Sequence, residues 1–161
     1  MSYVTFSGQS TFNSLLARCL SQIRAKNTNH CQGGFLALAT AALSPDIKAA
    51  AVYHPAMANM EGYLHGRAGG WLHRLRTDSV ASHRNTMAYY DAANFAPMVK
   101  APVYFVIGFN DNVVPPTTSF ATYNSISAPK QLVTIPIAEH WLFPENRKDS
   151  WSWIKSRLDV E

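Results

Sequence analysis

The apolar and polar stretches of the chain alternate in a way that predicts strands and helices in turn. Three apolar runs, rich in β-branched or aromatic residues, have the length of buried strands: 47–54, 102–109 and 131–137. Helical spacing and helix-ending prolines predict helices over 10–24, 33–43, 86–95, 117–126 and 147–158. This alternation predicts an α/β fold with a mostly parallel sheet of about 3–4 strands flanked by helices.

Two stretches fit this pattern poorly. Residues 25–30 precede the Gly33–Leu43 helix where a strand is expected, but the segment is polar, so any strand there is doubtful or short and at an edge. Residues 56–83 form an irregular insertion with no clean period, punctuated by four glycines. Such an insertion either covers a site or is a surface loop that fills space.

Composition excludes several classes of protein. A chain of 161 residues with 47% hydrophobic and 15% charged residues predicts one folded domain over 1–161. It has no apolar run of membrane-spanning length. The net charge of +4 is mild, and the basic residues form no nucleic-acid-binding module. Met1–Ser10 lacks the layout of a secretory signal, which favours a cytoplasmic location, although a processed chain would look the same.

The turn from Asn29 to Gly34 is the first candidate for chemistry. Two glycines allow a helix to begin close to a neighbouring backbone, and Cys31 occupies the apex of the turn. The amides of a helix N-terminus would stabilise negative charge there. The turn corresponds to a G-x-S-x-G nucleophile elbow in which two of the three defining residues differ. The alternative is a simple helix start with an inert cysteine.

Three side chains follow predicted strands in the order nucleophile, acid, base: Cys31, Asp111 and His140. Because parallel strands bring their carboxyl ends to one edge, these residues are expected to meet there. A histidine would take the proton of the nucleophile, and a carboxylate would orient its ring. The competing acids are Asp78 and Asp91, and the competing bases, on other elements, are His30 and His54. Cys19 and Cys31 show no metal-ligand spacing, and a disulfide between them would block the nucleophile.

Three segments resemble the acetyl xylan esterase and cephalosporin C deacetylase family of α/β-hydrolases. They are CQGGFLALATAAL, YYDAANFAPMVKAPVYFVIGFNDNVVPPTTSFATYNSI and PKQLVTIPIAEHW. The resemblance implies a partial α/β-hydrolase fold, with Cys31 in the position of the nucleophilic serine, Asp111 as the acid and His140 as the base. It implies that the Gln32 amide is one oxyanion donor, and that the substrates are acetylated sugars or related small esters. No metal or organic cofactor is implied.

The chain departs from the family in three respects. Cysteine replaces the serine, as in the similar elbow of dienelactone hydrolases, and Asn29 replaces the first elbow glycine. Only 30 residues precede Cys31, too few for the early strands and the loop that supplies the second oxyanion donor. The sheet would then have an open edge, which a homo-oligomer, a partner chain or a truncated gene product would explain.

Two functions follow from these observations. The first is a carboxylic-ester hydrolase of the acetyl esterase kind with a Cys/Ser-His-Asp type triad. The second is a catalytically impaired, truncated hydrolase remnant that acts as a binding or oligomerising domain. The position of the Cys31 sulfur relative to the His140 ring distinguishes them, because a nucleophile must lie within reach of its base.

Overall fold

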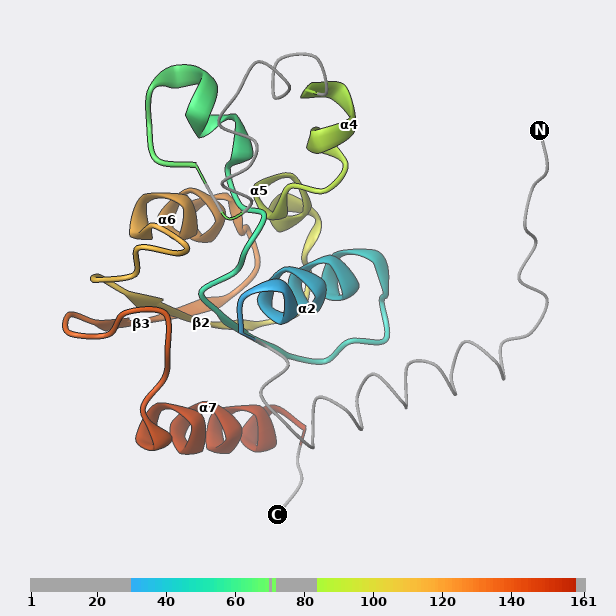
Figure 1. The fold of residues 1–161 in the computed structure, drawn as a ribbon. Helices are drawn as coiled ribbons and strands as arrows, with labels where there is room; N and C mark the ends of the chain where they lie inside the picture. Colours follow the sequence, from blue (N-terminus) through green and yellow to red (C-terminus); the bar gives the residue numbers. More distant parts are fainter. Residues whose placement is uncertain (1–29, 70, 72–83, 159–161) are drawn as a thin grey trace.

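A computed structural model describes residues 30–69, 71 and 84–158 (Figure 1). The predicted helix over 10–24 lies outside the described residues. The larger elements are α2 (Gln32–Leu43), β1 (Ala50–Tyr53), β2 (Val103–Gly108), α6 (Pro116–Ser125), β3 (Lys130–Ile135) and α7 (Pro144–Arg157). Shorter helical elements lie between β1 and β2: η1 (Met60–His65), α4 (Arg84–Ala88), α5 (Ala92–Phe95) and η3 (Ala96–Met98).

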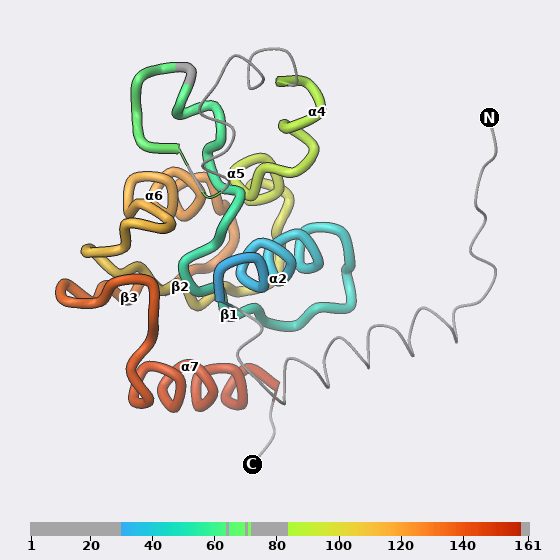
Figure 2. The backbone as a smooth tube through the Cα atoms, viewed as in Figure 1, coloured from blue at the N-terminus to red at the C-terminus, as the bar shows by residue number. Residues whose placement is uncertain are grey.

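The three strands form a parallel sheet in the order β1-β2-β3, as Figure 2 traces. Strand β2 lies in the middle, with Val103 level with Ala50 of β1 and with Lys130 of β3. All three strands run in one direction, so their carboxyl ends meet at the same edge. The predicted parallel α/β architecture is therefore confirmed for the described part of the chain.

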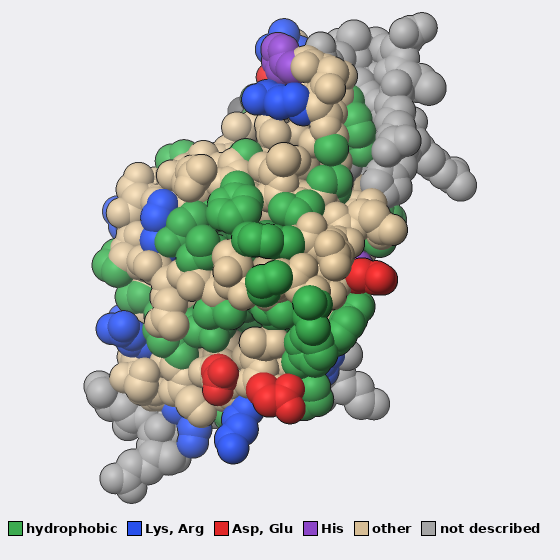
Figure 3. All heavy atoms as spheres, turned by 90° about the vertical axis from the view of Figure 1, so that its left-hand side faces the viewer, with side chains coloured by type: hydrophobic (Ala, Val, Ile, Leu, Met, Phe, Trp, Pro, Cys, Tyr) green, Lys and Arg blue, Asp and Glu red, His purple; other side chains and the backbone are tan. Residues whose placement is uncertain are grey.

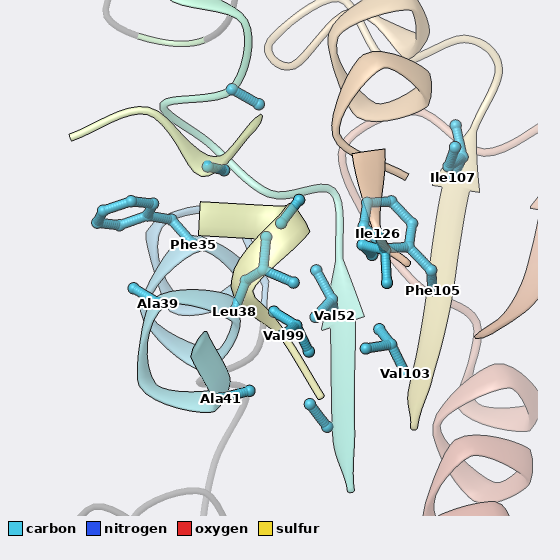
Figure 4. Close-up of a cluster of buried hydrophobic side chains, with 14 residues drawn as sticks. Phe35, Leu38, Ala39, Ala41, Val52, Val99, Val103, Phe105, Ile107 and Ile126 are labelled. Atoms are coloured by element: carbon cyan, nitrogen blue, oxygen red, sulfur yellow. The ribbon is translucent and has the colours of Figure 1, made fainter. Parts of the chain in front are cut away.

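Alternate residues of β2 pack against opposite layers of helices, as the two-residue period of a strand requires. Val103, Phe105 and Ile107 belong to a core cluster that includes residues of α2, α5 and η3 (Figure 4). Tyr104 and Val106 face the other way, towards Trp153 and Ile154 of α7. All six β2 residues are buried, which explains why the sequence of this strand is apolar throughout.

The helices cover both faces of the sheet. In Figure 1, α2, α5 and α6 lie on one side and α7 lies on the other. Helix α2 inserts the fully buried Leu38 into the core, and its alanines allow it to approach β1 closely. On the opposite face, the Tyr53 hydroxyl donates a hydrogen bond of 2.5 Å to Ser150 of α7. The sheet is thus the middle layer of three.

The predicted helix over Thr86–Phe95 is wrong as a single element. The structure has two short helices, α4 and α5, separated by a break that ends at Asp91. The Asp91 side chain caps α5 by accepting a hydrogen bond from the Ala93 amide, and an N-cap residue has non-helical backbone angles. Apolar spacing alone did not reveal this break, although Met87 of α4 and Ala92 of α5 pack in different core clusters.

Asp91 also fixes the path of the chain after β1. Its carboxylate accepts hydrogen bonds from the Asn59 amide at 2.8 Å and from the Met60 amide at 2.6 Å. Burial raises the pKa of Asp91, and the hydrogen bonds from these backbone amides partly offset that effect. This competing acid is therefore a structural residue.

The insertion predicted as irregular contains η1, which is bounded by left-handed residues at Asn59 and Gly66. The strands are shorter than predicted, because residues 47–49 lie outside β1 and residues 136–137 lie in a turn after β3. No helix in the described ranges is long and apolar enough to cross a membrane.

Replacement of Asp91 with alanine tests this description of the fold. Asp91→Ala leaves three backbone amides without their acceptor, two of them at the start of η1. We expect the free energy of unfolding to fall by about 3 kcal/mol, measured by urea denaturation. The matched control is Asp46→Ala, at an exposed aspartate, which should change it by less than about 0.5 kcal/mol. Equal stability of the two variants would contradict the role given to Asp91.

Candidate active site

The turn before α2 has the backbone geometry of a strained elbow. His30 forms an isolated parallel bridge with Tyr53 at the edge of the sheet, and Cys31 is the N-cap of α2 with φ 58° and ψ −120°. A positive φ is uncommon for a residue with a Cβ and costs about 1–3 kcal/mol. The rest of the predicted edge strand, including Asn29, lies outside the described residues.

Hydrogen bonds to its neighbours hold Cys31 in this conformation. Its amide donates to the Tyr53 carbonyl at 3.2 Å, and its carbonyl accepts from the Ala56 amide at 3.0 Å and the Gly34 amide at 3.0 Å. The end of β1 and the start of α2 thus clamp the residue from two sides. The clamp places the thiol at the apex of the turn, beside the carboxyl edge of the sheet. Cys31 is a free, half-buried cysteine.

The amide of Gln32 is the first N–H of α2, and a helix supplies no internal partner for it. The next three amides donate to carbonyls of the turn: Gly33 to His30, and both Gly34 and Phe35 to Cys31. Gln32 is exposed and directly follows the thiol. Its amide therefore suits the oxyanion role predicted for it.

Asp111 follows β2 and is almost completely buried. Its Oδ1 accepts hydrogen bonds from the Val113 amide at 2.9 Å and from the Val114 amide at 2.8 Å. Its Oδ2 lies 2.7 Å from Nδ1 of His140. Burial alone would raise the pKa of Asp111, but the hydrogen bonds from His140, His54 and Val114 hold it well below its usual range. The carboxylate is therefore ionised at neutral pH.

His140 follows β3 and meets Asp111 across the loops that leave the two strands. The Asn110 amide donates to the Ala138 carbonyl at 3.0 Å, which ties these loops together. Burial alone would lower the pKa of His140, but the hydrogen bond to Asp111 and the neighbouring Cys31 thiol outweigh it and raise the pKa to about 9. The Nε2 atom of His140 is buried and has no hydrogen-bond partner within the described part, and the Cys31 side chain is close enough to raise the pKa of the ring.

Two further histidines join the site, and sequence reasoning had placed both of them on other elements. The ring centroids of His30 and His140 lie 4.3 Å apart, and those of His54 and His140 lie 5.7 Å apart. Burial, together with the neighbouring His140 and His54 rings, lowers the pKa of His30 to about 4. His54 directly follows β1, so the strand-end rule that selected Asp111 and His140 could also have found it.

Gly108 permits this close grouping at the end of β2. A Cβ at this position would lie 2.6 Å from the Ala138 carbonyl oxygen, 2.8 Å from that of Glu139 and 2.8 Å from Cε1 of His54. Real Cβ atoms do not approach backbone oxygens so closely. The glycine therefore lets the loop that carries His140 and the ring of His54 meet over β2.

One group within the described ranges has the composition of a metal site. The ligand atoms of His54, Asp111 and His140 lie within 4.8 Å of one another. However, Oδ2 of Asp111 lies within hydrogen-bond range of both Nδ1 atoms, at 2.7 Å and 3.1 Å. Hydrogen bonds therefore account for the grouping, and a metal ion would have to displace them.

Apolar side chains surround the carboxyl edge of the sheet. Phe109, Ile137 and Trp141 are exposed large hydrophobic residues that follow β2 and β3. Figure 3 views the molecule from the side of Figure 1 on which these loops lie, and hydrophobic side chains gather on that face. A shallow pocket lined by Pro102, Pro129 and Trp153 lies at the opposite, amino ends of the strands and contains no residue of the candidate site.

Comparisons with known proteins point to one family of esterases. The sequence profile of the acetyl xylan esterase (AXE1) family matches residues 17–157. Over 129 residues, the chain is 46% identical to acetyl esterase Axe7A of Xylanibacter ruminicola, and the match covers 79% of this chain and 29% of that protein.

Solved structures of two esterases resemble the fold. An acetyl xylan esterase from Paenibacillus sp. R4 superposes with a TM-score of 0.69 at 25% identity, covering 87% of this chain and 50% of that one. Acetyl xylan esterase 1 from Thermoanaerobacterium sp. JW/SL YS485 gives 0.67 at 21% identity, covering 96% and 59%. The predicted α/β-hydrolase fold class is thereby confirmed. The chain spans about a third to three-fifths of the length of these relatives.

The two shifted histidines predict how stability depends on pH. The pKa of His30 is lowered from 6.5 to about 4, so the unfolded chain binds the extra proton and stability falls as the pH drops from 6.5 towards 4. The pKa of His140 is raised to about 9. The protonated ring therefore stabilises the fold fully below pH 6.5, and this stabilisation is lost as the pH rises through 9.

His30→Asn tests the acid side of this profile. In urea titrations, the unaltered chain should lose about 2 kcal/mol more than the variant between pH 6.5 and pH 4. His65→Asn, at an exposed histidine, should retain the full loss. An identical acid profile for the His30 variant and the unaltered chain would contradict the environment described for His30.

Proposed function

The chain belongs to the acetyl xylan esterase family, and we propose that it is a carboxylic-ester hydrolase of the acetyl esterase kind in which Cys31 is the nucleophile. The chain spans only part of the length of its relatives, so activity and substrate are inferred here from the site. The observation that carries the proposal is the 2.7 Å pair of Asp111 and His140 beside a cysteine with strained elbow geometry.

In the first half of the proposed reaction, Cys31 attacks the acyl carbon of the ester. The thiol proton passes to Nε2 of His140, an atom with no hydrogen-bond partner among the described residues. Asp111 holds the opposite ring nitrogen and stabilises the imidazolium that results. The carbon–sulfur bond forms as the carbonyl electrons move to oxygen, and the Gln32 amide donates to that oxyanion.

The tetrahedral intermediate then collapses. The carbon–oxygen bond to the alcohol breaks, and the imidazolium of His140 donates its proton to the departing oxygen. This leaves a thioester on Cys31 and a neutral His140. In the second half, His140 removes a proton from water, which attacks the thioester and releases the acid and the Cys31 thiol.

The raised pKa of His140 bears on which of these steps is slow. A pKa of about 9 means that His140, once it has taken the thiol proton, holds it at neutral pH and is ready to donate it to the departing alcohol. Deacylation instead needs the neutral ring as a base. In the acyl-enzyme Cys31 no longer raises the pKa of His140, but the hydrogen bond to Asp111 still does, so we expect deacylation to be the slower step and an acyl-enzyme to accumulate.

Sugar acetates fit the proposed site as substrates. A relative named acetyl esterase shares 46% identity over most of this chain, and exposed aromatic side chains at the carboxyl edge of the sheet offer flat surfaces of the kind that pack against sugar rings. A second copy of the chain could cover the apolar edge beside the site.

Rapid mixing with p-nitrophenyl acetate tests the proposal. We expect a burst of nitrophenol followed by slow turnover. Cys31→Ala should abolish the burst, and Asp111→Asn should slow it by about 100-fold because the His140 ring loses its orienting partner. Cys19→Ala is the matched control and should keep the full burst. Cys31→Ser should raise the steady rate at least about tenfold, because serine forms an oxygen-ester acyl-enzyme of the kind that serine hydrolases turn over.

The alternative is a catalytically impaired remnant that binds a ligand or a partner. It predicts that the unaltered chain, Cys31→Ala and Cys31→Ser all release nitrophenol at the rate of buffer. That result would overturn the esterase proposal.

A further inference from the structure

Among the described residues, His54 is the one side chain in contact with the Asp111 carboxylate that the proposed mechanism leaves without a role. It is 1% exposed, at the carboxyl end of β1. Its Nδ1 lies 3.1 Å from the same Oδ2 that meets His140. Its backbone has φ 42°, and its amide donates to the Val106 carbonyl of β2 at 3.2 Å. The ring is thus held in place by the central strand.

The Nδ1 atom of His54 lies near both a hydrogen-bond donor and a hydrogen-bond acceptor. The Gly108 amide lies 3.4 Å from it and would need it as an acceptor. Oδ2 of Asp111 lies 3.1 Å from it and would need it as a donor. A neutral imidazole nitrogen can meet only one of these demands.

The hydrogen bond from Nδ1 to the Asp111 carboxylate is stronger than one from the Gly108 amide to Nδ1. Hydrogen bonds to charged groups are roughly twice as strong as those between neutral groups. The shorter of the two distances also favours it, and a lone pair facing an ionised oxygen at 3.1 Å would be repelled. The proton of His54 therefore belongs on Nδ1, pointing at Asp111.

Asp111 then accepts four donors. Two backbone amides bind Oδ1, at Val113 and Val114, and two imidazoles bind Oδ2, at His54 and His140. A carboxylate has about four acceptor positions, so the group is saturated. Every donor that shares Oδ2 draws negative charge from the hydrogen bond to His140.

We propose that His54 is a positioning residue for the reaction, which holds the Asp111 carboxylate through an Nδ1–H donor and limits how strongly Asp111 retains the proton of His140. It acts through Asp111 and His140 and takes no part in the bond changes of the reaction. By sharing Oδ2, it keeps the base of the triad closer to the range in which it can both take and release a proton. This inference rests on the proposed function for its catalytic meaning, but its geometry and its test do not need turnover.

The other groups around His140 do not remove this effect. His30 lies against its ring, and Arg147 is a further positive charge that acts on the cluster. Neither has a hydrogen bond to Asp111 in the described part of the chain. Only His54 competes directly for the oxygen that holds His140.

Nitrogen-15 NMR of the full chain, labelled at histidine, tests the proposal in two ways. In the unaltered protein, the ¹⁵N shifts of His54 should show the proton on Nδ1 and not on Nε2. A proton on Nε2 alone would mean that Nδ1 accepts from Gly108, which overturns the proposal without any variant.

A pH titration of the His140 ring provides the second readout. His54→Phe keeps a ring but removes the donor, and it should raise the pKa of His140 by about half a unit to one unit, the equivalent of one hydrogen bond. His54→Asn can place an amide donor near the position of Nδ1 and should keep the pKa within about 0.3 units. His54→Leu replaces the phenylalanine variant if that one fails to fold. An unchanged or lowered pKa in a folded donor-free variant overturns the proposal.

The same variants separate this inference from the proposed esterase activity. If the chain turns over esters, the pH profile of the nitrophenol burst should move upward in His54→Phe by the same amount as the pKa of His140. If the titrations shift as expected but no variant releases nitrophenol, His54 has the role proposed here and the esterase proposal is what fails.

Discussion

The burial of β2 between two strands and two layers of helices is the constraint from which the rest follows. Every residue of this strand is buried, and both of its edges are occupied by parallel partners. A chain packed in this way can place polar groups only where the strand ends. Asp111 follows β2, His54 follows β1 and His140 follows β3, and Gly108 leaves the space in which they meet.

A single carboxylate then organises the charge of the site. Asp111 is held ionised by its four donors, and it supports positive charge on the nearest ring, whereas His30 is kept neutral at pH 7 by burial and by its neighbours. The proton that the cluster carries is concentrated on His140, next to Cys31. A thiol ionises far more readily than a hydroxyl, so a cysteine at this position can form an ion pair with an imidazolium.

Periodicity and strand-end placement were enough to predict the parallel sheet and the meeting of Asp111 with His140. They failed where a side chain overrides the local pattern. Asp91 splits a predicted helix because its carboxylate caps α5 and binds two distant amides. His54 was set aside as a competing base, because sequence spacing does not show that Gly108 leaves room for its ring beside the loop that carries His140. The pairing of Cys31 with His140 stays a prediction.

The central claim is that these strand ends assemble one reactive cysteine. The most direct test is a peptide map of the chain, acid-quenched within seconds of mixing with p-nitrophenyl acetate. Trypsin separates the two cysteines into peptides 19–24 and 27–48. The account predicts one acetyl group on Cys31 in peptide 27–48, none on Cys19, and loss of the label in Asp111→Asn. Equal labelling of both cysteines, or none on Cys31, would contradict it.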